Sequence, residues 1–120
     1  MNQRLERISS EIREILGSAL VRGEIKDPRV RLAGLITITH VRVTGDLREA
    51  IAAFIVHDVD EAALQRAEQG LNSAAGYLRR LIGQQLRLKV TPTLTFEIDR
   101  VFDQEAKIDR LLHEVATEKK

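Results

Sequence analysis

Two runs rich in β-branched residues follow each other in the chain, at residues 35–43 and 48–56. Only Thr44-Gly45-Asp46-Leu47 separates them, and a Gly-Asp pair between two such runs is typical of a tight hairpin turn. β-Branched side chains favour strands because they pack well on a pleated surface. The two runs therefore predict an antiparallel β-hairpin, against which the rest of the chain has to pack.

The segments on either side of the hairpin have a helical period instead. Residues 4–21 carry apolar side chains at steps of three and four, and Gly23 and then Pro28 end the pattern. A second stripe runs from Ala63 to Leu86, after a start that Asp58 or Asp60 would cap. Each glycine inside it costs about 1 kcal/mol relative to alanine; these are Gly70, Gly76 and Gly83. We therefore predict two helices that meet at a sharp kink near Gly76.

The C-terminal third predicts one more strand and one more helix. Residues 93–98 alternate cleanly, so a third strand is expected to bury Leu94, Phe96 and Ile98 on one face. A last helix is expected at about 103–116, with Asp103 as its cap. Its apolar stripe consists of Ile108, Leu111, Leu112 and Val115, and a frayed end follows at Glu118-Lys119-Lys120.

The resulting order, α-β-β-α-α-β-α, predicts an α+β fold in which helices cover one face of a three-stranded sheet. We expect a single domain over residues 1–120, with its core at about 4–99. Only 3% of the residues are aromatic while 43% are hydrophobic, so the core must be aliphatic.

The sequence has no cysteine, which excludes disulfides and thiolate metal sites and fits a reducing compartment. No stretch reaches the roughly 18 apolar residues that a membrane span needs. We therefore expect a cytoplasmic protein without a membrane segment.

Charge is unevenly distributed along the chain, although the net charge is only +1. Residues 46–68 carry six carboxylates and two cations, whereas residues 69–96 carry four cations and no acid. Phosphate binding requires such a local positive field, whatever the total charge.

Nothing in the sequence indicates catalysis. The histidines stand apart, without a second ligand at metal spacing, and a structural role is the more common one for them: His40, His57 and His113. The serines have no nucleophile elbow around them, and no phosphate-binding glycine loop is present. We expect a protein that is not an enzyme and has no metal or cofactor.

The predicted kink is the first candidate binding site. Ala74, Ala75 and Gly76 would leave the N-terminal amides of the second helix without side-chain caps, and such amides attract phosphate. Small side chains would also let a nucleic-acid backbone come close. The alternative, a helix-helix turn that packing alone requires, stays open.

Cations near the kink and elsewhere are candidates for phosphate contacts. The first group follows the kink: Arg79, Arg80, Arg87 and Lys89. The second group lies in the charged loop at residues 23–32: Lys26, Arg29 and Arg31. The third group lies on the first helix: Arg4 and Arg7. The alternatives are a solvated helix face for the arginines that follow the kink, and an internal ion pair with Asp27 for the loop.

Several segments, in this order and spacing, resemble the ribosome-binding factor A family from Arg4 to about Leu112. They are Glu24-Ile25-Lys26-Asp27-Pro28-Arg29, Ile36-Thr37-Ile38-Thr39, Asp46-Leu47, Ala74-Ala75-Gly76-Tyr77-Leu78-Arg79, Leu86-Arg87-Leu88-Lys89, Pro92-Thr93-Leu94-Thr95-Phe96 and Ile108 with Leu111-Leu112. The sequence departs from the family pattern after Phe96, where Asp99 is followed by Arg100-Val101.

The resemblance implies a type II KH-like domain in which an Ala-x-Gly kink replaces the GXXG loop. It also implies a cytoplasmic, monomeric factor that binds the free small (30S) ribosomal subunit, assists late maturation and processing of 16S rRNA, and supports growth in the cold. Small-subunit rRNA is the implied ligand, and an assembly GTPase is a further candidate partner.

A competing hypothesis is a protein-interaction module that binds a protein partner through the sheet edge or the acidic 46–68 face. A small RNA nuclease ranks third, because the sequence lacks an acid-base pair for it.

Overall fold

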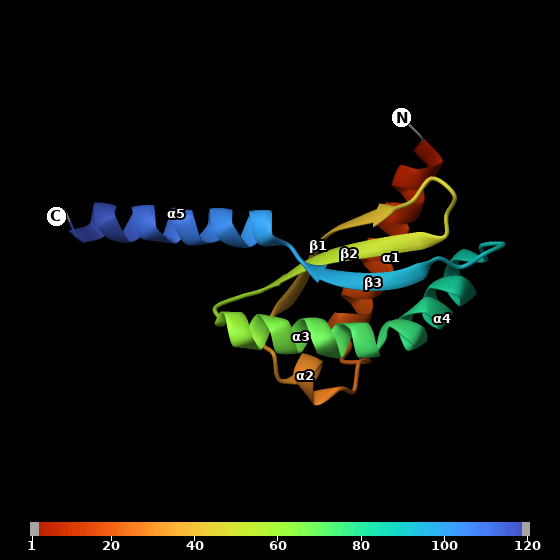
Figure 1. Cartoon of the computed structure of the whole chain (residues 1–120), viewed down its shortest axis with the longest axis horizontal. Helices are drawn as coiled ribbons and strands as arrows, with labels where there is room; N and C mark the ends of the chain where they lie inside the picture. Colours follow the sequence, from red (N-terminus) through yellow and green to blue (C-terminus); the bar gives the residue numbers. More distant parts are fainter. Residues whose placement is uncertain (1–2, 119–120) are drawn as a thin grey trace.

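The computed structural model describes residues 3–118 and shows a three-stranded sheet with helices packed on it (Figure 1). The elements, in chain order, are α1 (Gln3–Val21), α2 (Pro28–Arg31), β1 (Ile36–Val43), β2 (Glu49–Val56), α3 (Glu61–Ser73), α4 (Ala75–Leu86), β3 (Thr93–Ile98) and α5 (Arg100–Glu118). The order of a type II KH-like domain is present, with α2 and α5 added. The predicted α+β class is confirmed.

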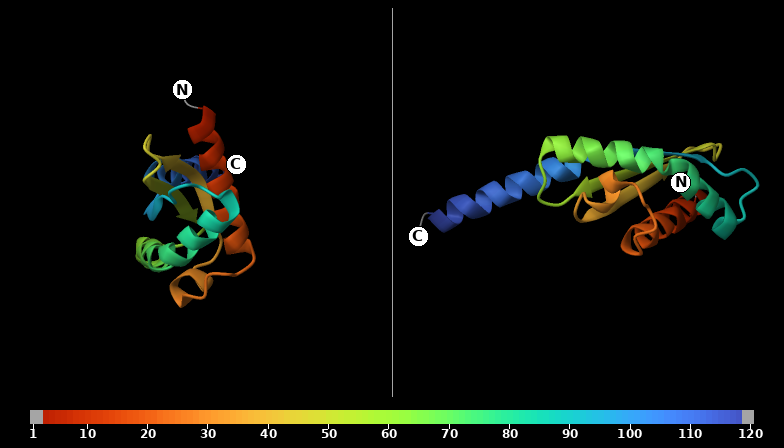
Figure 2. Two further views of the ribbon diagram at one scale, coloured as in Figure 1. Left: turned by 90° about the vertical axis from the view of Figure 1, so that its right-hand side faces the viewer. Right: turned by 90° about the horizontal axis from the view of Figure 1, so that it is seen from below.

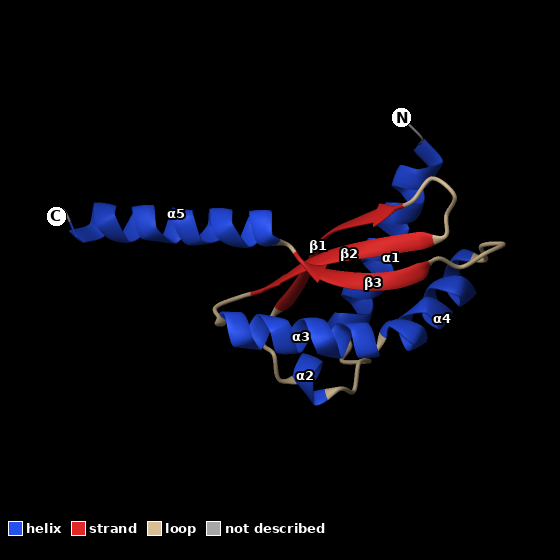
Figure 3. Ribbon diagram, viewed as in Figure 1, coloured by secondary structure: helices blue, strands red, loops and turns tan. Residues whose placement is uncertain are grey.

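The strand order in the sheet is β1-β2-β3 (Figure 3). β1 and β2 are antiparallel, with Val43 opposite Ala50. β3 runs parallel to β2, with Ala50 opposite Leu94. Parallel neighbours need a long crossover, and α3 and α4 form it.

The predicted hairpin is confirmed, but its turn differs from the prediction. Five residues, 44–48, connect the strands, and the left-handed residue is Leu47 (φ 61°) rather than Gly45. Asp46 Oδ1 accepts hydrogen bonds from Thr44 Oγ1 (2.8 Å) and from the backbone N–H of Arg48 (3.1 Å). These local bonds stabilise a wider loop than a two-residue Gly-Asp turn would form.

One face of the sheet forms the core, as predicted. Leu94, Phe96 and Ile98 are buried there, next to the fully buried Phe54 of the central strand. α1 packs against β1, while α3 and α4 pack against β3. The opposite face carries exposed polar side chains on the outer strands: Thr37, His40, Thr95 and Glu97.

The loop predicted at residues 23–32 contains a short helix that the sequence reading missed. α2 begins at Pro28, and the carboxylate of Asp27 caps it by accepting the backbone N–H of Arg29 (2.9 Å). Proline suits the first position of a helix because its missing N–H would have no partner there. Val30 is thereby buried against α3.

The predicted break between two helices is confirmed, but it lies at Ala74, two residues before Gly76. Asn72, in the last turn of α3, explains the position. Its Nδ2 donates to Phe96 O (3.1 Å), and its Oδ1 accepts the backbone N–H of Phe96 (2.8 Å). This pair of bonds fixes the end of α3 against β3, so the chain changes direction immediately afterwards. At the other end of α3, Asp60 is the N-cap.

The prediction for the last helix is wrong at its start. α5 begins at Arg100 rather than near Asp103, because Asp99 Oδ1 accepts the backbone N–H of Phe102 (3.0 Å) and caps the helix earlier. α5 then projects away from the sheet (Figure 2), and its apolar stripe is exposed. Lys119 and Lys120, predicted to be a frayed end, lie outside the described residues.

Gly70 marks the closest approach between α2 and α3, and we predict that Gly70→Ala destabilises the domain. A Cβ at this position would lie 2.8 Å from Arg29 Cβ and 2.9 Å from Val30 Cγ2. Displacing α2 should lower the free energy of unfolding by about 1–3 kcal/mol in urea denaturation. Gly17→Ala is the matched control, since nothing lies within 4 Å of its added methyl group. Equal unfolding midpoints for the two variants would contradict the close contact.

Candidate nucleic-acid interface

The junction between α3 and α4 (residues 73–76) exposes a helix N-terminus without a side-chain cap. Ala74 ends α3 and begins α4, with φ −87° and ψ −3°. Its own N–H bonds back to Gly70 O and Leu71 O (both 3.1 Å). No side chain among the described residues caps α4. Its first-turn amides therefore offer hydrogen-bond donors together with the positive end of a helix dipole.

Gly76 leaves the surface of this junction open. It is exposed in the first turn of α4, and no atom lies within 4 Å of where a Cβ would be. Internal packing therefore does not require a glycine at this position, in contrast to Gly70. The neighbouring Ala74 and Ala75 are partly buried, so the small residues form a shallow backbone surface that an external chain can approach.

Arg79, a first-choice candidate from the sequence, is largely occupied by contacts within the domain. Its Nε donates to the carbonyl oxygens of Thr91 and Pro92 (both 3.2 Å), and its Nη2 donates to Thr91 O (2.8 Å). These bonds fix the segment that enters β3. The interpretation of Arg79 as a phosphate ligand therefore weakens, because its donors already stabilise the chain.

Arg80 lies on the same side of α4 as Gly76, and Arg87 follows the end of the helix. A spacing of four residues places Gly76 and Arg80 along one helix face, whereas Arg87 is the left-handed residue that ends α4 and does not follow the helical spacing. Within the described part of the chain, neither arginine forms an ion pair or a side-chain hydrogen bond. Lys89 is also exposed, two residues beyond Arg87. The Gly76 face thus combines an open backbone with the guanidinium group of Arg80, which is available for phosphate, and Arg87 and Lys89 add exposed cations beyond the end of the helix.

Arg87 occupies an unusual backbone position for its type. It ends α4 in the left-handed conformation (φ 51°, ψ 41°), where glycine is the usual residue. A side chain there costs about 1 kcal/mol relative to glycine. The backbone conformation at position 87 therefore favours glycine, yet the chain has an arginine there.

Arg29 forms an internal ion pair with Asp27, which is the alternative that the sequence analysis gave for this loop. Its Nη2 lies 2.7 Å from Asp27 Oδ2 and also donates to Ser73 Oγ (2.9 Å). The hydrogen bond from the Arg29 side chain lowers the pKa of Asp27 below its ordinary value. The contact connects α2 to the junction at the point where α3 ends.

A hollow beside the junction contains Lys26 and an aromatic side chain that the sequence reading missed. It is lined by Glu24, Ile25, Lys26, Asp27, Ser73, Ala74 and Tyr77. Tyr77 is 42% exposed, and its hydroxyl donates to Glu24 Oε1 (3.3 Å). The signal in the sequence was a single tyrosine directly after Gly76, in a chain with few aromatics. An exposed ring next to a backbone-binding surface can stack on an unpaired base.

The other candidate cations lie away from the junction. Arg31 lines a separate hollow with Leu20, Val21 and Leu35. Arg4 and Arg7 lie at the start of α1, and a helix of 19 residues is about 28 Å long. The end of α1, not its start, leads into the loop that contacts the junction. The structure therefore places Lys26 and Arg80 near the junction and Arg87 and Lys89 beyond the far end of α4, which is about 18 Å long. It leaves Arg4, Arg7 and Arg31 apart.

Acidic side chains reach α4 from a distant part of the sequence. Glu11, Glu14 and Glu24 line a groove together with Leu81 and Gln85. Residues 69–96 contain no acidic residue, but acidic side chains from other segments lie beside them in the fold. Glu11 and Glu14 repel phosphate from the side of α4 that faces α1. Glu24 also lines the hollow beside the junction, where it accepts the hydrogen bond from Tyr77.

The described residues include no group of three or more His, Asp or Glu side chains that could hold a metal ion. None of the helices described here is long and apolar enough to cross a bilayer.

Comparison with known proteins gives a consistent relationship. Residues 4–112 match the family described as Ribosome-binding factor A. A protein of that name from Geobacter sulfurreducens is 45% identical over 119 residues, covering 99% of this chain and 97% of the relative. The solution NMR structure of a Thermotoga maritima protein described as a ribosome binding factor A has a TM-score of 0.67 and 30% identity, covering 78% of this chain and 85% of that one.

A third similar chain is the ribosome binding factor A of Thermus thermophilus, a homology model fitted into a cryo-EM map of a 30S–RbfA complex. It has a TM-score of 0.60 and 21% identity, and covers 77% of this chain and 91% of that one. At this identity the likeness concerns the fold.

We predict different effects on stability for the two adjacent arginines. Arg79→Ala should lower the free energy of unfolding by about 1 kcal/mol, because the carbonyl groups of Thr91 and Pro92 lose a charged donor. Arg80→Ala, its matched control, should change it by less than about 0.5 kcal/mol, as is usual for an exposed side chain. Urea denaturation monitored by circular dichroism measures both. If the two variants unfold at the same urea concentration, Arg79 has no structural role.

Proposed function

The chain belongs to the ribosome-binding factor A family, and on this premise we propose that it binds the free 30S subunit and assists late maturation and processing of 16S rRNA. The proposal includes a role in growth at low temperature and a cytoplasmic location, as the family resemblance implies. It describes a monomeric binding protein and not an enzyme.

The observation that carries the proposal is the open junction with the exposed Arg80 beside it. A phosphate backbone would meet the uncapped α4 N-terminus, the open surface at Gly76, and Arg80 on the same helix face. Arg87 would add a cation beyond the end of the helix. KH domains clamp nucleotide backbones at a comparable glycine-containing loop between two helices. The similar Thermus chain, placed in a map of a 30S–RbfA complex, supports the small subunit as the particle that presents the RNA.

The proposed mechanism is selective binding and involves no chemical step. A binding protein shifts a conformational equilibrium only by as much as it prefers one state over the other. Contacts at the junction require single-stranded or splayed nucleotides, because a backbone has to reach the α4 amides while a base has room beside Tyr77. The protein would therefore stabilise an rRNA conformation in which such a segment is unpaired.

The competing hypothesis of a protein-interaction module loses part of its basis. The outer edge of β3 is occupied, since Asn72 bonds with Phe96, and Glu68 Oε2 accepts the backbone N–H of Ile98 (3.2 Å). In the acidic 46–68 segment, Glu61 and Asp58 bind arginines of α5. An assembly GTPase as a further partner remains part of the proposal, through a surface other than these.

We predict that Gly76→Ala separates binding from folding. The added methyl group meets nothing within the domain and raises helix propensity, so stability should stay equal or rise by up to about 1 kcal/mol. Affinity for purified 30S subunits, measured by filter binding, should fall at least tenfold, because the methyl group keeps the RNA backbone away. Gly17→Ala is the matched control, with an equally open position on α1. Identical affinities for the two variants would falsify the junction as the binding surface.

Salt dependence tests the phosphate contacts separately. If about four phosphates are neutralised, the slope of log affinity against log salt concentration should be about −3. Arg80→Ala combined with Arg87→Gly should make it shallower, to about −1.5, and should leave the fold intact because glycine suits the left-handed position. Arg4→Ala with Arg7→Ala serves as the control and should preserve the slope. The assignment fails if the first pair leaves the slope unchanged while the control pair alters it.

A further inference from the structure

α5 presents an apolar surface that the domain itself does not cover. Its large apolar side chains are between 46% and 70% exposed: Val101, Phe102, Ile108, Leu111, Leu112 and Val115. Ile108, Leu112 and Val115 follow each other at steps of four and three, so they share one helix face. A continuous exposed apolar stripe of this kind marks an interaction surface, since single exposed side chains would be scattered.

The helix extends away from the sheet. The molecule measures 59 × 37 × 20 Å, and its radius of gyration is 16.1 Å, whereas a compact chain of this length would have about 14 Å. In Figure 1, α5 lies at the opposite side of the molecule from α4, and the second view of Figure 2 shows the same separation. The stripe is therefore well removed from the proposed RNA-binding face.

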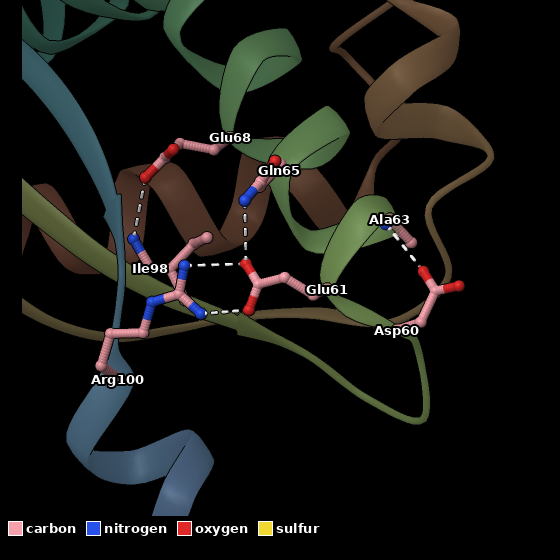
Figure 4. Close-up of polar contacts among 7 residues, drawn as sticks. All are labelled: Asp60, Glu61, Ala63, Gln65, Glu68, Ile98 and Arg100. Atoms are coloured by element: carbon pink, nitrogen blue, oxygen red, sulfur yellow. Dashed lines mark hydrogen bonds and ion pairs between the residues drawn. The ribbon is translucent and has the colours of Figure 1, made fainter.

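The base of α5 is held firmly, so the helix has a defined direction. Arg100 donates to both carboxylate oxygens of Glu61, with Nη2 at 2.8 Å from Oε2, as Figure 4 shows. Arg110 Nη1 lies 3.0 Å from Asp58 Oδ1. The cap residue Asp99 also accepts a hydrogen bond from Thr39 Oγ1 of β1 (2.5 Å). Burial raises the pKa of Asp99, but the bonds from Thr39 and from the Phe102 N–H and the nearby His40 outweigh it and lower the pKa below its ordinary value.

The charge around the stripe indicates what kind of partner fits it. Arg100 and Arg110 face carboxylates of the domain's own α3 and of the loop before it. Glu105 and Asp109, both exposed, follow one edge of the stripe. Along the other edge the sequence carries Arg100, Lys107 and Glu114, so only one edge is acidic. The acidic edge repels RNA phosphates, so this side of α5 is unsuited to the ligand that fits the Arg80 face.

We propose that α5 inserts its apolar stripe into a groove of a basic, RNA-binding protein of the small subunit. The inference rests on the proposed binding to that subunit. Besides RNA, such a particle offers proteins that bind RNA, and these are rich in Lys and Arg. An apolar stripe with one acidic edge is complementary to a protein groove that carries cations along the matching edge, in the helix-in-groove mode. Two sites at opposite ends, one for RNA and one for protein, then raise the overall affinity above that of either alone.

A crosslinking experiment identifies what covers the stripe. Full-length protein with photo-leucine in place of Leu112 is bound to purified 30S subunits and irradiated. Leu112 is 63% exposed, so the replacement leaves the fold unchanged. The expected product is a crosslink to a subunit protein with an excess of Lys and Arg. A crosslink to rRNA, a crosslink to a second copy of this chain, or no crosslink at all overturns the proposal.

An affinity measurement separates this proposal from the function on which it rests. Ile108→Ala, Leu111→Ala and Leu112→Ala combined should weaken subunit binding at least tenfold and leave the salt slope unchanged, because no phosphate contact is lost. Gln104→Ala, four residues before Ile108 on the same face, removes no apolar side chain and should bind within twofold of the original chain. If the triple variant binds as tightly as the control while Gly76→Ala still weakens binding, α5 docking fails and the RNA interface survives. If the original chain binds no subunits, both proposals fail.

Discussion

The two hydrogen bonds between Asn72 and Phe96 are the contact on which the geometry of the candidate interface depends. β3 is an edge strand, and its unpaired backbone groups need partners. Asn72 and Glu68 of α3 provide them, and Arg79 of α4 does the same for the segment that enters the strand. The side chains that close the sheet edge thereby also fix the end of one helix and the start of the next. The exposed amides at the start of α4 therefore follow from the contacts that Asn72 makes with the β3 edge of the sheet.

The elements whose side chains meet the core could be predicted from the sequence. Alternation in β3 correctly gave Leu94, Phe96 and Ile98 as buried, and the helical period correctly gave α1. Features that depend on polar side chains could not be predicted in the same way. The start of α5 is set by Asp99 and that of α2 by Asp27, and several carboxylates in each region could have served as caps. The stripe of α5 shows the limit of periodicity, which identifies an apolar face without saying what covers it.

The candidate interface could be predicted in composition but not in detail. The small residues at the junction and the acid-free segment were visible in the sequence. Which cation is available depends on contacts across the fold: Arg79 reaches Thr91 and Arg29 reaches Ser73, whereas Arg80 forms no such bond within the described chain. Adjacent arginines are alike in sequence, and only the path of the neighbouring backbone distinguishes them. The same holds for the glycines, since Gly70 faces α2 and Gly76 faces solvent.

The parallel pairing of β2 with β3 also has a consequence for the order in which the chain acquires its structure. The β1–β2 hairpin joins neighbouring residues and closes locally, within microseconds for such units. β3 can join only after the whole crossover from 57 to 92 exists, because its partner lies on the far side of that segment. On a translating ribosome, the hairpin is complete long before residue 98 has been added. During that interval the apolar face of the hairpin lacks its third strand and stays exposed. Chaperones that bind exposed apolar segments can bind it at this stage.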